Sequence, residues 1–175
     1  MVKNKIIKNS IIAIGNFDGV HRGHQEIFKL GKKIAKKNKT KFGVVTFSPL
    51  PSEFFQKQKN NNRITRDDIK IDLLKKNKVN FIFVCNFNKN FSNISAEQFI
   101  KDTIVKKLNA TYVLVGKNFR FGHKRKGNVS LLKKYRKMID DITVVEGVNR
   151  QTHLGKCADG SHRHPDHGQD RRAHV

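Results

Sequence analysis

The sequence alternates short apolar runs with segments of helical periodicity, and this alternation constrains the fold more than any other feature. Five apolar runs have the length of buried strands, and they span residues 10–15, 41–47, 79–87, 110–116 and 141–148. Strands that alternate with helices favour a parallel sheet covered by crossover helices. We therefore expect an α/β fold in which ligands bind beyond the carboxyl ends of the strands.

The segments between these runs place apolar residues at spacings of three and four, as amphipathic helices do. Helices are predicted over residues 24–38, 65–77, 95–109 and 128–139. Thr65 is the expected N-cap of the second helix, and Ser95 with Gln98 three residues later has the pattern of a capping box. The long segment 48–63, between the second strand and the second helix, is predicted to be a loop.

The length of 175 residues is typical of a single domain. The sequence has no apolar run of about 18 residues and no signal-peptide pattern, so we expect a cytoplasmic protein that does not contact membranes. Cys85 and Cys157 are too few and too distant for a disulfide framework. Cys85 lies within an apolar run and is expected to be a buried thiol.

The formal net charge of +23 raises the alternative of a basic nucleic-acid-binding protein. The lysines, however, are spread along helices and loops, and no basic platform with interleaved aromatic residues is evident. Anionic phosphate substrates and general solvation account for the charge better than nucleic acid does. We therefore expect no nucleic-acid partner.

The composition changes after Asn149. Residues 150–175 contain five of the eight histidines and one lysine, but no isoleucine, phenylalanine or asparagine. We expect a domain over residues 1–149 followed by a disordered tail that is a frameshift or fusion remnant. The tail sequence "HRHPDH" (162–167) matches a metal-ligand pattern of metallo-β-lactamases, but the further ligands of that site would have to follow, so only adventitious zinc or nickel binding is expected.

The turn between the first strand and the first helix carries the chemistry. Gly15 and Gly19 allow a sharp bend or a close approach to a ligand. His21 and His24 follow at the start of the helix, where free amides and the helix dipole favour phosphate. Because the two histidines are one helical turn apart, both can face one phosphate chain. Two surface histidines without a ligand are the alternative.

The stretch "GNFDGVHRGH" resembles the signature of the HxGH nucleotidyltransferases. Within them, the chain is similar to the adenylyltransferase domain of the bacterial bifunctional riboflavin kinase/FMN adenylyltransferases, because segments 44–55, 87–100 and 113–128 match that family in order and spacing. The resemblance implies a Rossmann-like three-layer domain that transfers the adenylyl group of ATP to FMN, giving FAD and pyrophosphate. Another HxGH enzyme, such as a cytidylyltransferase or pantetheine-phosphate adenylyltransferase, is the alternative.

The resemblance also implies the site residues. The expected catalytic residues are His21, His24 and Asn118. The expected ATP contacts are Gly15, Asn16, Phe17, Asp18, Gly23 and Arg125. The expected FMN contacts are Ser48, Pro49, Pro51, Phe119, Arg120 and Phe121. Mg²⁺ is expected to enter with ATP, near Asn118, and no metal ligand set is predicted. Asp18 could instead stabilise the turn, Asn118 could be a turn residue, Arg125 a solvated charge, and one of the two phenylalanines a core residue.

Two departures from the family pattern bear on activity. Ser48 and Leu50 stand where the family commonly has an acidic residue and a histidine, although Pro49 and Pro51 preserve the shape of the loop. After the last strand the family continues into a serine- and threonine-rich turn that ends in isoleucine and arginine, and residues 150–162 do not match it. We expect the riboflavin kinase domain of the family to be absent. We therefore expect impaired FAD formation and no kinase activity.

Overall fold

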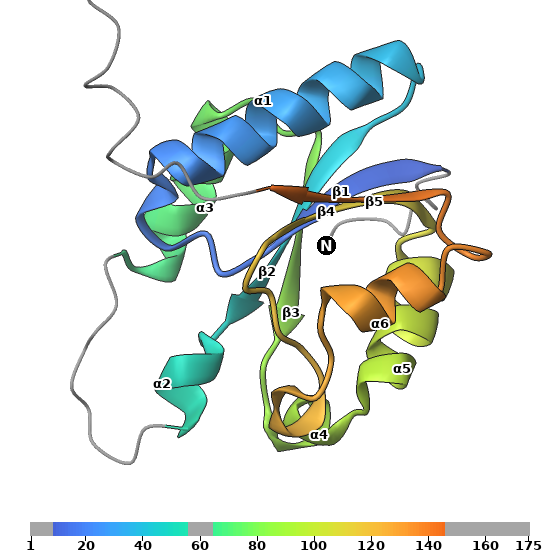
Figure 1. The fold of residues 1–175 in the computed structure, drawn as a ribbon. Helices are drawn as coiled ribbons and strands as arrows, with labels where there is room; N and C mark the ends of the chain where they lie inside the picture. Colours follow the sequence, from blue (N-terminus) through green and yellow to red (C-terminus); the bar gives the residue numbers. More distant parts are fainter. Residues whose placement is uncertain (1–8, 56–64, 146–175) are drawn as a thin grey trace, which may run out of the picture.

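The computed structural model describes residues 9–55 and 65–145 and contains a parallel five-stranded sheet. The strands lie in the order β3-β2-β1-β4-β5, as Figure 1 shows. Their bounds are Ser10–Ile14 (β1), Phe42–Ser48 (β2), Phe81–Asn86 (β3), Ala110–Gly116 (β4) and Asp141–Val145 (β5). All five predicted strands are confirmed, except that residues 146–148 of the last one lie outside the described residues.

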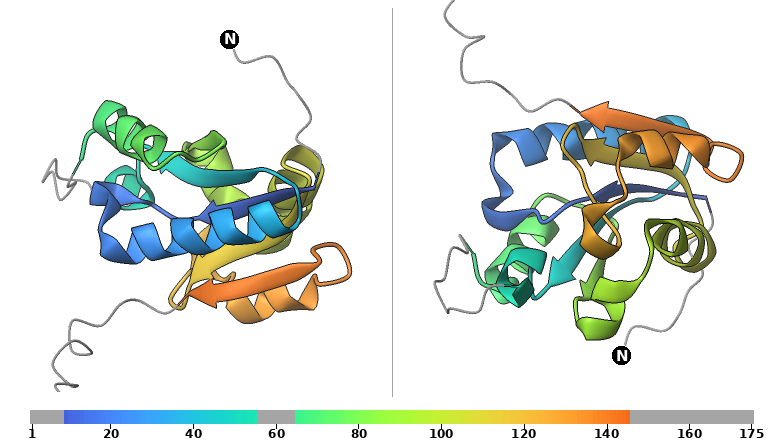
Figure 2. Two further views of the ribbon diagram at one scale, coloured as in Figure 1. Left: turned by 90° about the horizontal axis from the view of Figure 1, so that it is seen from above. Right: turned by 60° about the horizontal axis from the view of Figure 1, so that its bottom comes forward.

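Helices cover both faces of the sheet and form three layers (Figures 1 and 2). One face packs against α1 (Arg22–Lys37) and α3 (Asp67–Lys76). The other face packs against α5 (Ala96–Gln98), its π-helical continuation η2 (Phe99–Lys107) and α6 (Val129–Lys134). The α/β Rossmann-like architecture is therefore confirmed.

The strand β1 lies at the centre of the sheet and is buried on both faces. Ile11 and Ala13 belong to the core beneath α1, whereas Ile12 and Ile14 belong to the core on the opposite face. A strand buried on both sides is apolar throughout, rather than alternating with polar residues. This explains why the sequence shows a continuous apolar run at this strand.

The order of the strands creates a crevice at one end of β1. From β1 the chain continues to β2 and β3 on one side, and it then crosses to β4 and β5 on the other. In open parallel sheets the carboxyl ends of the two strands at such a reversal bound a ligand crevice. Here the two strands are β1 and β4, so the crevice lies next to the turn that precedes α1.

Four local features differ from or refine the sequence predictions. The described part of the predicted loop 48–63 contains the short helix α2 (Pro51–Phe55), and residues 56–63 lie outside the described residues. The helix α4 (Lys89–Asn93) was not predicted. The last helix, α6, ends at Lys134 rather than at residue 139. The capping box is confirmed, because the backbone N–H groups of Ser95 and Gln98 each donate to the other residue's side chain at 3.0 Å.

The N-cap prediction for α3 was wrong. The N-cap is Arg66, and its side chain does not cap the helix. Thr65 instead hydrogen-bonds to Asp18, which lies 47 residues earlier in the chain. A tertiary contact has therefore taken the side chain that the sequence assigned to a local cap.

The prediction of a buried thiol at Cys85 is confirmed. Cys85 is buried in the sheet, and burial raises the pKa of its thiol to about 12. Within residues 9–55 and 65–145, no helix is both long and apolar enough to cross a membrane. Cys157 and the predicted tail 150–175 lie outside the described residues.

Candidate active site

The turn from β1 to α1 has an unusual backbone. Phe17 and Val20 have positive φ angles of 49° and 37°, and Gly19 between them has φ of 71°. Positive φ costs of order 1–3 kcal/mol for a residue with a Cβ. The ring of Phe17 folds back toward Gly15, where an added Cβ would lie 3.2 Å from that ring. The glycine therefore permits the compact turn that delivers the chain to the helix start.

His21 and His24 form a stacked pair at the start of α1. Their ring centroids are 3.7 Å apart, and the ring planes differ by 25°. His21 is the N-cap residue, and Gly23 lies beneath its ring, because a Cβ at Gly23 would come within 3.1 Å of it. The edge of the Phe17 ring packs on His24 with 5.1 Å between centroids. The HxGH spacing therefore builds a layered stack of rings at the helix start.

His24 is held in its neutral form. Its Nδ1 atom is buried and has no hydrogen-bond partner among the described residues. Burial, and secondarily the neighbouring His21, lowers the pKa of His24 from 6.5 to about 4, against the opposing effect of Asp18. At neutral pH this imidazole therefore offers one N–H donor and one acceptor and carries no charge.

The helix start itself favours an anion. The first turn of α1 contains no acidic residue, and no side chain caps it in the described structure. The first amides of a helix lack intrahelical partners, and the helix dipole places partial positive charge there. A phosphate group is the natural ligand for this position.

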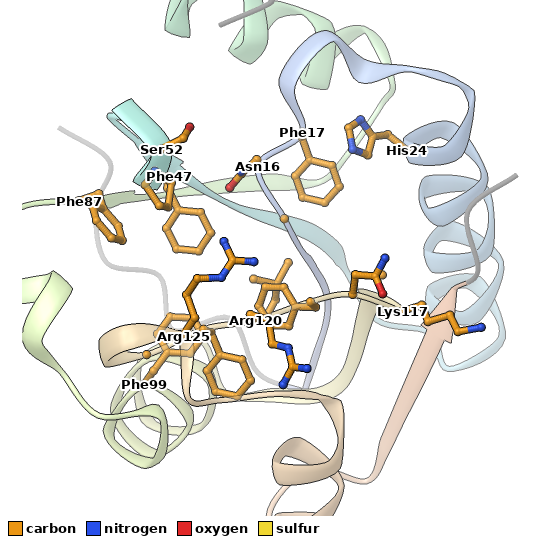
Figure 3. A pocket seen from close by; sticks show the side chains of 18 of the residues that line it. Asn16, Phe17, His24, Phe47, Ser52, Phe87, Phe99, Lys117, Arg120 and Arg125 are labelled. Atoms are coloured by element: carbon orange, nitrogen blue, oxygen red, sulfur yellow. The ribbon is translucent and has the colours of Figure 1, made fainter. Parts of the chain in front are cut away.

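A cavity of about 770 Å³ lies between this helix start and the carboxyl ends of β1 and β4. In Figure 3, Phe17 and His24 lie on one side of the cavity, and Phe47 and Phe87 lie on the other. Most of the predicted site residues line it: Gly15, Asn16, Phe17, His21, Gly23, His24, Pro51, Asn118, Phe119, Arg120, Phe121 and Arg125. The structure therefore brings together segments that are more than 100 residues apart in the sequence.

Three predicted residues do not line this cavity. Asp18 accepts hydrogen bonds from the backbone N–H and the hydroxyl of Thr65, both at 2.8 Å, which is the turn-stabilising role left open above. Ser48 donates its hydroxyl hydrogen bond to Asp67 of α3. Pro49 follows Ser48 through a cis peptide bond. Ser48 and Pro49 thus shape the end of β2 behind the cavity wall.

An aromatic wall forms the side of the cavity opposite the histidines. Phe47 lies 6.2 Å from both Phe87 and Phe91, and Phe99 continues the chain of contacts from Phe91 at 6.0 Å to Phe121 at 5.6 Å, between ring centroids. Sequence reasoning assigned a role to Phe121 but not to the other four. Their only signal was the frequency of phenylalanine in segments 44–55 and 87–100.

Cationic side chains supply the remaining polar lining. They are Lys117, Arg120, Lys124 and Arg125, and the lining among the described residues includes no aspartate or glutamate. Lys124 and Arg125 have φ angles of 52° and 56° in the loop that follows Gly122. Figure 3 shows Arg125 extending into the cavity toward Phe47. The site is therefore suited to anions and unfavourable for a positively charged ligand.

The cavity also contains neutral oxygen ligands. Asn16 follows β1, and Asn118 follows β4 in a turn closed by the hydrogen bond from Phe119 N–H to the Gly116 carbonyl at 3.0 Å. Within the described part of the chain, no group of three or more His, Cys, Asp or Glu side chains could hold a metal ion. A divalent cation would therefore depend on phosphate oxygens that its ligand brings.

The sequence is similar to known proteins over most of its length. A model of the FAD synthetase family matches residues 3–156, beyond the change in composition after Asn149. The chain is 44% identical over 129 residues to a bifunctional riboflavin kinase/FMN adenylyltransferase of Buchnera aphidicola from Schizaphis graminum, covering 74% of this chain and 41% of that protein. The Escherichia coli K12 protein of the same name is 36% identical over 124 residues, covering 71% and 40%.

The fold is also shared with a solved structure. A crystal structure described as a macrolide-efflux protein from Streptococcus pneumoniae aligns with a TM-score of 0.72 and 27% identity, covering 82% of this chain and 47% of that one. The chain spans about two fifths of the length of the curated relatives it matches. Because the family model covers most of the sequence, the chain belongs to the FAD synthetase family.

Proposed function

We propose that the chain transfers the adenylyl group of ATP to the phosphate of FMN, giving FAD and pyrophosphate. The observation that supports this most directly is the composition of the cavity. One side is a phosphate-binding helix start with His21 and His24, and the other is a wall of phenylalanines large enough to flank a fused aromatic ring. Curated relatives named as FMN adenylyltransferases support the same activity.

The reaction requires alignment and charge neutralisation rather than a protein nucleophile. An FMN phosphate oxygen attacks the α-phosphorus of ATP, the new P–O bond forms, and the bond between the α-phosphorus and the bridging oxygen breaks. The electron pair and negative charge leave on pyrophosphate. Holding both phosphates in line and stabilising the departing charge are the main contributions open to the protein.

The helix start is assigned to the triphosphate. The free amides of α1 and the N–H groups of His21 and His24 can donate to its oxygens. His24 donates as a neutral group, since its pKa lies near 4. Positive charge is supplied from the other side of the cavity by Arg120 and Arg125. The two sides together enclose the reacting phosphates.

The aromatic wall is assigned to the isoalloxazine ring. Phe47, Phe87 and Phe91 present ring faces and edges that are suited to offset or edge-on packing. Arg125 extends toward this wall, where its guanidinium can pair with the FMN phosphate. This places the nucleophilic phosphate between the flavin side and the nucleotide side.

Mg²⁺ fits the site as a partner of the triphosphate. The amide oxygens of Asn16 and Asn118 are hard neutral ligands, and Mg²⁺ in nucleotide sites is commonly held by few protein groups together with phosphates. When bound, the ion neutralises phosphate charge as pyrophosphate leaves. The remaining coordination would come from the nucleotide and water.

The proposal is tested by incubating the chain with FMN and Mg-ATP and separating FMN from FAD by chromatography. Calorimetry with each substrate alone distinguishes the rival HxGH activities. If ATP binds and FMN at concentrations well above micromolar does not, the flavin assignment is wrong. If neither FMN nor ATP binds, the proposed function fails as a whole.

The flavin side can be tested with a matched pair of variants. Phe87→Ala removes a ring from the cavity wall, and Phe83→Ala removes a ring from β3 that does not line the cavity. We expect Phe87→Ala to weaken FMN binding at least fivefold, measured by quenching of flavin fluorescence, with ATP binding unchanged. Equal FMN affinities in the two variants would contradict the assignment of the wall.

The sequence after the last strand limits the expected rate. Residues 150–162 do not match the family's phosphate-binding turn, and they lie outside the described residues. Losing one charged phosphate contact commonly costs about 2–4 kcal/mol of transition-state stabilisation. We infer that replacing residues 150–175 with a family-type ending raises the rate of FAD formation at least tenfold. A parent chain with the turnover of an intact family enzyme would refute this.

A further inference from the structure

Thr65 contacts the turn between β1 and α1 from outside the cavity. We propose that Thr65 is a positioning residue that fixes the turn between β1 and α1, and with it the orientation of His21 and His24. The inference rests on the proposed function for its kinetic consequences, but its structural part can be measured without substrates. Thr65 lies two residues before the start of α3 (Asp67–Lys76) and does not line the cavity.

Three hydrogen bonds join Thr65 to the turn. The Thr65 hydroxyl donates to Oδ1 of Asp18 at 2.8 Å, and the same hydroxyl accepts a hydrogen bond from Gly19 N–H at 3.2 Å. The backbone N–H of Thr65 donates to the same carboxylate oxygen at 2.8 Å. The hydroxyl thus closes a ring of polar contacts that holds one side chain and one backbone amide of the turn.

The turn needs such an attachment because its backbone is strained. Phe17, Gly19 and Val20 all have positive φ, and the side chain of Phe17 does not cap η1 (Asp18–Val20). Strained backbone persists only where surrounding contacts over-determine it. On its other side the turn is fixed by the Thr46 hydroxyl of β2, which donates to the Asn16 carbonyl at 2.9 Å. Thr46 and Thr65 therefore clamp the turn from two elements.

The turn held by Thr46 and Thr65 is connected to the histidines by direct ring contacts. Phe17 directly precedes Asp18 and packs on the His24 ring, while His21 follows Asp18 by three residues and stacks on His24. A turn that relaxes at Asp18 and Gly19 changes both contacts. The aromatic wall is built on β2, η2 and the segment around α4 (Lys89–Asn93), none of which Thr65 holds through these bonds. The effect should therefore be confined to the nucleotide side.

The test compares Thr65→Val, which keeps the shape and removes the hydroxyl, with Thr65→Ser, which restores it. Thr40→Val is the matched control, because Thr40 also makes a hydroxyl hydrogen bond, to the Asn9 carbonyl at 2.6 Å, at the far end of α1. The measurements are the dissociation constants for Mg-ATP and FMN, kcat and KM for FAD formation, thermal stability, and the NMR resonances of the His21 and His24 rings.

We expect Thr65→Val to weaken Mg-ATP binding about tenfold, as the loss of two hydrogen bonds implies, and to lower kcat. FMN affinity should stay within twofold of the parent value, and the His24 ring resonances should shift. Thr65→Ser should recover ATP binding to within twofold, and Thr40→Val should leave ATP binding and both histidine resonances unchanged.

Two results would overturn the inference. One is unchanged histidine resonances and ATP affinity in Thr65→Val. The other is an equal loss of ATP and FMN binding that follows thermal stability alone, because that result indicates a merely structural role. If the parent chain makes no FAD, the proposed function fails, whereas the histidine resonances of Thr65→Val still decide the positioning role.

Discussion

Acidification should destabilise the fold through His24. The pKa of His24 is lowered from 6.5 to about 4, first by burial and then by His21. Between these values the unfolded chain binds a proton at this residue and the folded chain does not. The free energy of unfolding must therefore rise with pH between about pH 4 and pH 6.5. Above about pH 6.5 His24 is neutral in both states and no longer affects stability.

The size of the effect follows from the same two values. A fall in pKa from 6.5 to about 4 corresponds to about 3.5 kcal/mol at about 1.4 kcal/mol per pKa unit. His24 is only partly buried, so solvent screening reduces this figure, and we expect about 2 kcal/mol at pH 4.5 relative to pH 7. A loss of this size is a substantial fraction of the stability of a typical domain.

The assay compares the parent chain with His24→Asn, which cannot titrate in this range. The free energy of unfolding of each is measured by urea titration at several values between pH 4.5 and pH 7.5. Carboxylates and other histidines titrate in both proteins, so their effects cancel in the difference. We expect the stability of the parent relative to the variant to decrease by about 2 kcal/mol as the pH falls to 4.5. A difference independent of pH would refute the reasoning that His24 is buried and neutral.

Three further perturbations test other parts of the site. Gly23→Ala places a Cβ 3.1 Å from the His21 ring, so we expect at least fivefold weaker ATP binding by calorimetry without loss of thermal stability. Lys70→Met removes a buried ammonium that donates to the Phe47 carbonyl at 2.8 Å and pairs with Asp67 at 3.0 Å, and urea unfolding should show a loss of about 2 kcal/mol. Gly31→Ala would place a Cβ 2.2 Å from the Phe42 ring, and we expect a loss of about 1–3 kcal/mol by urea unfolding.

The central strand β1 could be predicted because it is buried on both faces. Ile11 and Ile12 belong to the cores on opposite faces of the sheet, so every position of the strand favours an apolar residue. A short continuous apolar run followed by a segment of helical periodicity is typical of a buried parallel strand. The capping box of Ser95 was also predictable, because all its atoms lie within one turn. By contrast, the five-residue helix α2 is too short to show helical periodicity.

The site divides in the same way into local and long-range parts. His21, Gly23 and His24 lie within four positions of the sequence, so their spacing predicts their place at a helix start, although it does not predict that the two rings stack. The aromatic wall joins Phe47 to Phe87 across 40 positions, and no periodicity marks it. The assignment of Thr65 as a helix cap was wrong for the same reason, because its partner Asp18 lies on another element.

The net charge of the chain and the charge of its cavity require separate explanations. A formal charge of +23 spread over helices and loops attracts any anion and distinguishes none. The cavity differs because its described lining combines four cationic side chains with apolar rings and includes no aspartate or glutamate. The proposed reaction brings two anionic substrates together, and their mutual repulsion would be offset between Arg125 and the start of α1. The position of the charges, rather than their number, is what makes this cavity suited to joining two phosphates.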